Sequence, residues 1–250
     1  MYKLGKKPAK HDARTLKLAS YLKVADLPPI PAEVKYHERV RNYPMYQNDV
    51  IGDCAIAGPA HQIQTWSAND GTEITPTEGQ VLEGYQRVGG WNPADPSTDQ
   101  GCILLNVMNA WRREGICGRK IGAFAAVNND GIDTFKAGVY MFGGAMLGVN
   151  LPAAIEGADE WVLPGHVPMR QRREWQAGSW GGHCVPATGF DNSYVYFVSW
   201  GKVMRMTWDF LFAFCDESFI AVAPEWLGPD FKAPNGLDMT TLLRDLTRLT

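Results

Sequence analysis

The stretch Asn48-Asp49-Val50-Ile51-Gly52-Asp53-Cys54-Ala55-Ile56-Ala57 decides the fold of this chain. A polar loop leads into Cys54, and an apolar helical pattern begins on that same residue. Asp53 is suited to be the N-cap, which would place Cys54 in the first helical turn. The partial positive charge of that helix end favours a thiolate, so Cys54 is a candidate nucleophile. The alternative is that Cys54 is a small buried apolar side chain.

Composition indicates a globular chain with a basic N-terminal segment. Of the 250 residues, 45% are hydrophobic and 20% are charged, which is typical of folded domains. Residues 1–25 contain seven basic residues and one acid, a formal charge of +6, so the remainder carries −9 of the total of −3. Such a segment could contact nucleic acid, an acidic partner or its own domain, or it could be a solvated tail. Because no nucleic-acid motif accompanies it, we do not expect nucleic-acid binding.

The cysteines and the apolar runs indicate which disulfides, metal sites and membrane segments to expect. The five cysteines are odd in number and form no C-x-x-C pair, so neither a disulfide framework nor a metal site is expected, and no cofactor is indicated. Cysteines 102, 117, 184 and 215 fit apolar patterns and are expected in the core. No apolar run approaches the roughly 18 residues of a membrane span. No signal-peptide pattern is present, so the prediction is a cytoplasmic protein without membrane contact.

The chain divides into an arm, a body and a C-terminal segment. Residues 1–47 are predicted to form a basic, extended arm laid over the body, because prolines at 28, 29 and 31 exclude helix there. Residues 48–227 are predicted to form the body, with a helical lobe at about 48–120, a sheet lobe at about 140–227 and an irregular insertion at 151–180. Residues 228–250 are expected to be a loop and helix packed on the body. This order predicts the α+β class.

Periodicity places the individual elements. Helices are predicted to start at Cys54, at Thr75–Glu78, before the apolar stripe 103–111, at 133–141 and at 207–214. Strands are predicted at 145–149, 183–190, 194–200, 203–206 and 219–222.

A cysteine nucleophile needs a base, and His183 is the best candidate among five histidines. It opens a predicted strand directly after Gly181-Gly182, which permit close approach of another backbone. His61 lies on the nucleophile's own helix, roughly 10 Å away along the axis at 1.5 Å per residue, so it cannot pair with Cys54.

The order of these features resembles that of the papain-like cysteine peptidases. The elements that carry the resemblance are Asn48-x5-Cys54 before a helix, Gly101-Cys102 before another, Gly-Gly-His183 opening a strand, and Ser199-Trp200-Gly201. They span residues 45–223. The resemblance implies two lobes, one helical and one barrel-like and antiparallel, with an active-site cleft between them.

The resemblance also assigns roles. Cys54 takes the nucleophile position, His183 the general base and acid, and Asn48 the oxyanion-hole position, where the family has a longer glutamine. Trp200 takes the place of the tryptophan that shields the third member. Gly52, Asp53 and Gly182 are expected to line the cleft. No metal is implied.

The third catalytic position departs from the family pattern. Where the family has Asn before Ser-Trp-Gly, this chain has Val198, which cannot hydrogen-bond an imidazole. Ser199, Asp191, a backbone carbonyl or water could replace it, and the sequence selects none of them.

Two function classes follow. The first is a papain-like cysteine hydrolase that cleaves a peptide or other amide bond through a Cys54 thioester. The second is a non-catalytic structural or assembly protein that uses residues 1–47 to bind protein partners. The N-D-x-x-G-D-C and W-G-G-H elements loosely resemble papain-fold proteins of unassigned role from tailed phages and prophages, which implies a virion-associated component. A propeptide-like cover ranks last, because the arm lacks long amphipathic helices.

Overall fold

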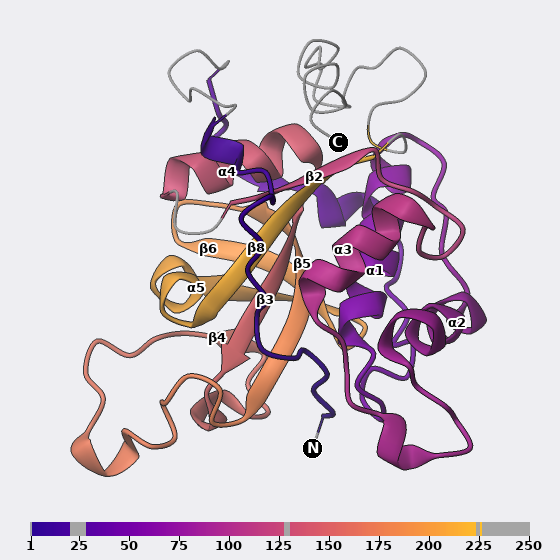
Figure 1. Ribbon diagram of the computed structural model, residues 1–250. Helices are drawn as coiled ribbons and strands as arrows, with labels where there is room; N and C mark the ends of the chain where they lie inside the picture. Colours follow the sequence, from indigo (N-terminus) through magenta and orange to yellow (C-terminus); the bar gives the residue numbers. More distant parts are fainter. Residues whose placement is uncertain (1, 21–28, 128–130, 224–225, 227–250) are drawn as a thin grey trace.

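Helices and strands separate into two lobes (Figure 1). The computed structural model describes residues 2–20, 29–127, 131–223 and 226. Three helices form one lobe, namely α1 (Cys54–Asn69), α2 (Glu78–Gly89) and α3 (Leu104–Arg113). The other lobe is built around a sheet of eight strands. The predicted α+β class is therefore confirmed.

The central helix α1 is buried along nearly its whole length, polar residues included. The neighbouring helix α2 begins at a capping box, because the Thr77 hydroxyl accepts from the Gln80 backbone while the Gln80 side chain accepts from the Thr77 backbone. It ends at Gly90, whose φ of 73° is the left-handed conformation that glycine favours. Local sequence signals thus fix the ends of the helix that flanks α1.

The sheet follows an open path in the order β2-β8-β3-β5-β6-β7-β4, with β1 also paired to β5. All pairs are antiparallel except β4 with β7. The strands are β1 (Val34–Lys35), β2 (Ala123–Ala126), β3 (Ala145–Leu151), β4 (Glu160–Trp161), β5 (Gly181–Phe190), β6 (Tyr194–Ser199), β7 (Lys202–Thr207) and β8 (Cys215–Val222). Strand β5 is central and carries His183.

Four strands differ from the sequence prediction. Strands β1, β2 and β4 were not predicted, since two to four residues are too few to show a periodicity. Strand β8 begins at Cys215, before the predicted start at Phe219. The earlier start was not predicted because the acidic pair Asp216 and Glu217 interrupts the apolar pattern. Helices α4 (Ile132–Phe142) and α5 (Trp208–Phe214) lie close to their predicted ranges.

The N-terminal residues run along the boundary between the two lobes, as the indigo trace in Figure 1 shows. Short 3₁₀ helices at Leu18–Ser20 and Tyr36–Arg39 and the strand β1 are the regular elements described before α1. The insertion at 151–180 contains β4 and two 3₁₀ helices, Ala153–Ile155 and Met169–Gln171. The predicted C-terminal helix in 228–250 lies outside the described residues. Within the described ranges, no helix has the length and apolarity needed to span a bilayer.

Candidate active site

Cys54 is the first residue of α1 and is only 1% exposed. Its thiol lies against strand β5, because the backbone of Cys184, the residue after His183, hydrogen-bonds to it. Burial raises the pKa of the Cys54 thiol to about 12, and backbone hydrogen bonds from Cys184 and Gly5 only partly oppose this rise. In this conformation desolvation therefore favours the neutral thiol of Cys54 over the thiolate.

The loop before α1 is held by a buried side-chain pair. Asp53 occupies the N-cap position, but its carboxylate makes no hydrogen bond to the helix backbone. Instead Asn48 Nδ2 donates to Asp53 Oδ1 at 2.9 Å, and both side chains are buried. Burial raises the pKa of the Asp53 carboxyl to about 8, so it is mostly uncharged at pH 7.

His183 is fully buried on β5 and has one side-chain partner. Its Nε2 lies 2.8 Å from the hydroxyl oxygen of Ser199, while its Nδ1 is buried without a hydrogen-bond partner. Burial lowers the pKa of the imidazole to about 3, so the ring is neutral at pH 7. If Nε2 carries the proton and donates it to Ser199, the unpaired Nδ1 is left as a free base.

Ser199, and not Val198, occupies the position behind the imidazole. Neighbouring side chains on a strand point to opposite faces, so Phe197 and Ser199 share one face of β6 and Val198 lies on the other. Trp161 marks the shared face, because its ring contacts Phe197 at a centroid distance of 4.4 Å and His183 at 6.5 Å. Val198 therefore points away from the imidazole, and of the substitutes that the sequence left open, Ser199 is the one that contacts the ring.

Trp200 covers His183 and is itself covered by the N-terminus. Its indole stacks on the imidazole at a centroid distance of 4.6 Å, and Tyr2 stacks on the other side of the indole at 4.3 Å. Trp200 and Gly201 form the two-residue turn between β6 and β7, with φ values of 48° and 70°. A positive φ at tryptophan costs of the order of 1 kcal/mol, and here it positions the indole over the histidine.

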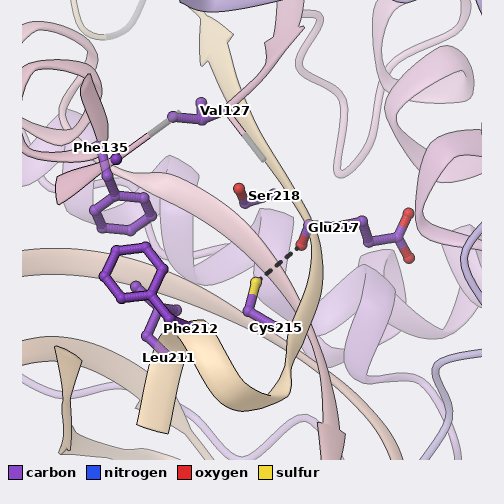
Figure 2. A pocket seen from close by; sticks show the side chains of 8 residues that line it. Val127, Phe135, Leu211, Phe212, Cys215, Glu217 and Ser218 are labelled. Atoms are coloured by element: carbon purple, nitrogen blue, oxygen red, sulfur yellow. Dashed lines mark hydrogen bonds between the residues drawn. The ribbon is translucent and has the colours of Figure 1, made fainter. Parts of the chain in front are cut away.

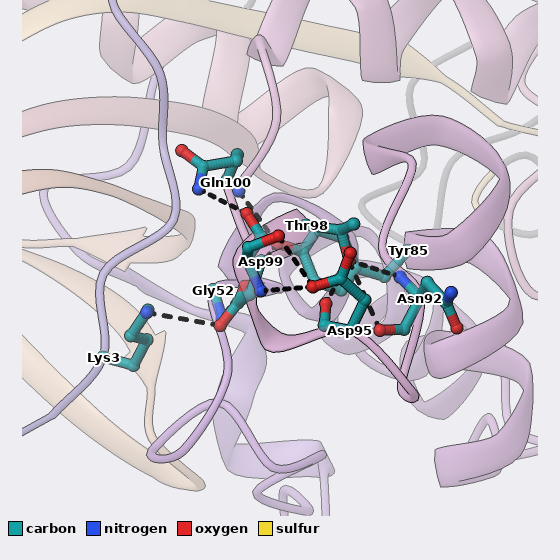
Figure 3. Close-up of polar contacts among 10 residues, drawn as sticks. Lys3, Gly52, Tyr85, Asn92, Asp95, Thr98, Asp99 and Gln100 are labelled. Carbon is teal, nitrogen blue, oxygen red and sulfur yellow. Dashed lines mark hydrogen bonds and ion pairs between the residues drawn. The ribbon is translucent and has the colours of Figure 1, made fainter.

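Asp99 connects the loop before Cys54 to the rest of the cleft (Figure 3). Its Oδ1 accepts from the Gly52 backbone at 2.9 Å and from the Tyr85 hydroxyl at 2.6 Å. Its Oδ2 lies 3.3 Å from Lys3 Nζ. The Tyr85 hydroxyl in turn accepts from the Gly101 backbone at 2.8 Å. Asp99 thus joins both loops of this side of the cleft to the N-terminal residues.

Residues 2–7, which we call the cover segment, lie in the cleft. Lys3 N donates to Asp49 O at 3.2 Å, and Lys6 N donates to Gly182 O at 2.9 Å. The Lys7 N–H donates to the Cys102 carbonyl oxygen, and the Cys102 N–H donates to the Gly5 carbonyl oxygen, each at 2.8 Å. The cover segment therefore binds the loop before Cys54, the loop that contains Cys102 and the strand that carries His183.

The chain is too close to its neighbours for any side chain at Gly5. A Cβ built there would lie 1.9 Å from the carbonyl oxygen of Gly52. A Cβ on Gly101 would lie 2.0 Å from the Gly5 carbonyl oxygen, and one on Gly182 would lie 2.2 Å from the Lys6 carbonyl oxygen. The predicted cleft residues Gly52 and Gly182 thus give the cover segment its room.

Comparison with known proteins supports the fold. No protein-family model and no curated protein sequence matches the chain. Among solved structures, xylellain, a cysteine protease from Xylella fastidiosa, is similar over 89% of this chain and 96% of its own, with a TM-score of 0.66 and 16% identity. The cysteine protease CMS1MS2 of Carica candamarcensis covers 78% of this chain and 99% of its own, at a TM-score of 0.55 and 13% identity. Procathepsin B S9 of Trypanosoma congolense covers 88% of this chain and 86% of its own, at a TM-score of 0.59 and 11% identity. The chain has the papain-like cysteine-protease fold.

The remaining histidines and cysteines take structural positions. His61 Nε2 lies 2.8 Å from the carbonyl oxygen of Pro44, and its ring stacks on Tyr46. Cys102 and Cys184 are buried, as predicted, whereas Cys117 and Cys215 are half-buried. Within the described ranges, no group of three or more histidines, cysteines or acids is arranged to hold a metal ion. Sequence reasoning ranked a cover formed by the arm last and did not place residues 2–7 at the site.

Proposed function

We propose that this chain is a papain-like cysteine hydrolase of peptide or other amide bonds, with Cys54 as nucleophile and His183 as base and acid. Two observations carry the proposal together. Cys54, the first residue of α1, lies against β5 next to the strand position of His183, and Ser199 engages Nε2 of that histidine. This arrangement leaves the unpaired Nδ1 of His183 free to exchange a proton.

In the proposed reaction, His183 Nδ1 takes the proton of the Cys54 thiol, and the sulfur attacks the carbonyl carbon of the scissile amide. The carbon–nitrogen bond breaks as the imidazolium returns its proton to the amine, leaving a thioester on Cys54. Water then loses a proton to His183 and adds its hydroxyl to the acyl carbon, and the released thiolate regains that proton. The Cys54 N–H is free of helical partners at its position, and the second amide N–H of Asn48 would join it at the oxyanion.

We further propose that the cover segment holds this site inactive. It leaves Cys54 at 1% exposure and with a pKa raised to about 12, so almost no thiolate is present near neutral pH. The Gly5 backbone hydrogen-bonds to the Cys54 thiol, while the Gly5 carbonyl accepts from the Cys102 N–H, so the cover segment occupies the space beside the sulfur that a substrate would need.

A second candidate is a non-catalytic protein that keeps the fold for structural use. The complete burial of Cys54 and His183 beneath the protein's own chain favours it. In that case residues 2–7 act as a permanent part of the core. Assembly with partners, including a role in a virion, would then fall to other parts of the arm, because residues 2–7 are bound to the body.

Peptide hydrolysis by the full chain carrying Lys6→Glu distinguishes the two candidates. Reversing this charge places a carboxylate against Asp216 and Glu217 and is expected to displace the cover segment. Cleavage of a mixed peptide library, read by mass spectrometry, should appear in this variant and vanish on adding Cys54→Ser or His183→Ala. If iodoacetamide labels Cys54 rapidly in Lys6→Glu but no peptide is cleaved, the non-catalytic candidate is correct.

A further inference from the structure

The Lys6 side chain enters an acidic pocket in the sheet lobe. It is 0% exposed, although lysine is rarely fully buried. Its Nζ lies 2.8 Å from Asp216 Oδ1 and 2.9 Å from Asp216 Oδ2. The same nitrogen lies 3.6 Å from Glu217 Oε1 and 3.5 Å from Asn150 Oδ1. The pocket therefore provides only oxygen acceptors to the end of the side chain.

The acids at the base of the pocket exceed the charge of the lysine. Glu217 is 1% exposed, and neither of its carboxyl oxygens has a hydrogen-bond donor. Figure 2 shows its carboxylate pointing away from the apolar group of Phe135, Leu211 and Phe212 on the other side of β8. Burial raises the pKa of Glu217 to about 7, and Lys6 acts against that rise. A buried carboxyl without a donor is costly, so this pocket is suited to a cation with more donors than one ammonium.

The wall of the pocket is shaped for a long unbranched stem. A Cβ on Gly148 would lie 2.4 Å from Lys6 Cε and 2.6 Å from Glu217 Cγ. The glycine thus leaves the space that the methylene groups of the lysine fill. Lysine and arginine share such a stem, and the five donors of a guanidinium could also hydrogen-bond Glu217, which Lys6 reaches only as an ion pair at 3.6 Å.

The pocket lies one residue from the nucleophile. Gly5 hydrogen-bonds to the Cys54 thiol, and the next residue along the cover segment fills the pocket. The cover segment is held here by backbone hydrogen bonds to Gly182 and Cys102, which a peptide of any sequence could also form. The side-chain pocket is therefore the selective part of this binding surface.

We propose that the pocket formed by Gly148, Asn150, Asp216 and Glu217 selects a lysine or arginine of the peptide substrate, and that Lys6 imitates this side chain. That the bound peptide is a substrate rests on the proposed function, but the preference for a basic side chain can be tested by binding, without turnover. Because Lys6 is adjacent to Gly5, which hydrogen-bonds to the Cys54 thiol, the basic residue of a bound peptide would be a neighbour of the residue whose carbonyl is attacked.

Peptide binding to the full chain carrying Lys6→Glu and Cys54→Ser tests the proposal. The probes are fluorescein-labelled peptides Ala-Ala-Xaa-Ala-Ala-Ala with Arg, Lys, Leu or Glu at Xaa, and the readout is fluorescence anisotropy. Arg and Lys peptides should bind at least tenfold more tightly than the Leu peptide. Adding Asp216→Asn and Glu217→Gln should reduce that preference below threefold, whereas the charge-matched control Glu83→Gln with Glu156→Gln, at exposed positions, should preserve it.

Equal affinity for Leu and Arg, or a preference that survives the loss of both pocket acids, would overturn the proposal. With Cys54 intact, cleavage without a basic preference refutes the pocket alone. Basic-selective binding without cleavage refutes the hydrolase and leaves the pocket standing.

A second measurement serves if Lys6→Glu fails to fold. In Lys6→Ala, 20 mM n-propylammonium should raise the melting temperature by at least 2 °C, with no change in the unaltered chain and none from n-propanol. A folded Lys6→Ala chain that responds equally to both additives, or to neither, would contradict a cation-selective pocket.

Discussion

Replacing Gly5 by alanine should expose Cys54. The added methyl group would lie 1.9 Å from a backbone oxygen of Gly52, far inside van der Waals contact, so the cover segment cannot keep its position. We expect Gly5→Ala to lose the three backbone hydrogen bonds made by residues 5–7. At about 0.5–1.5 kcal/mol net each, the loss is about 1.5–4.5 kcal/mol. At about 1.4 kcal/mol per factor of ten, the open population rises ten- to thousandfold.

The assay is alkylation of the native chain by iodoacetamide at pH 8, followed by mass spectrometry of the peptide that contains Cys54. The rate should rise at least tenfold in Gly5→Ala, whereas the half-buried Cys117 provides an internal reference whose rate stays constant. Gly165→Ala is the matched control, because its methyl group would meet nothing within 4 Å. A folded Gly5→Ala chain whose Cys54 rate changes less than threefold would refute the assignment of residues 2–7 as the barrier to the thiol.

Three further outcomes are expected. In the Gly5→Ala background, Ser199→Ala should lower the Cys54 alkylation rate by up to about tenfold, the worth of one hydrogen bond, while Ser199→Thr keeps the hydroxyl and should stay within about threefold. Asp99→Ala should lower the free energy of unfolding in urea by about 2–4 kcal/mol, since it leaves several donors unpaired, against about 1 kcal/mol for Asp95→Ala, whose partners are exposed. Burial lowers the pKa of His61 to about 4, so the unfolded chain takes up the proton first and stability falls as pH drops from about 6.5 to 4. His61→Gln has no imidazole to protonate, so its free energy of unfolding does not fall in this way. The difference in free energy of unfolding between the unaltered chain and His61→Gln should therefore shrink by about 3 kcal/mol over that range. A constant difference would contradict a neutral buried imidazole.

The parts of the site that depend on local sequence were predicted. The start of α1 at Cys54 follows from a loop and an apolar period within a few residues, and His183 follows from a glycine pair opening a strand. The partner of His183 was left open, although strand alternation along β6 separates Val198 from Ser199 and could have decided it. Motif alignment alone left four possible groups behind the imidazole, of which the structure has Ser199.

The cover segment could not be predicted in the same way. Its position depends on contacts between Lys6 and Asp216, which are 210 residues apart, and on glycine spacing that has meaning only when three loops meet. The arm was ranked last as a cover because it lacks amphipathic helices. In the structure a short extended segment suffices, because four backbone hydrogen bonds, a buried ion pair and a ring stack hold it.

The distance in sequence between Lys6 and its pocket also sets an order of events during synthesis. Residues 2–7 are translated before β8, which supplies Asp216 and Glu217 and emerges roughly 10–40 s later at 5–20 residues per second. The cover segment therefore has no binding site until the sheet lobe has been translated. Each new molecule must complete its cleft before residues 2–7 can close it.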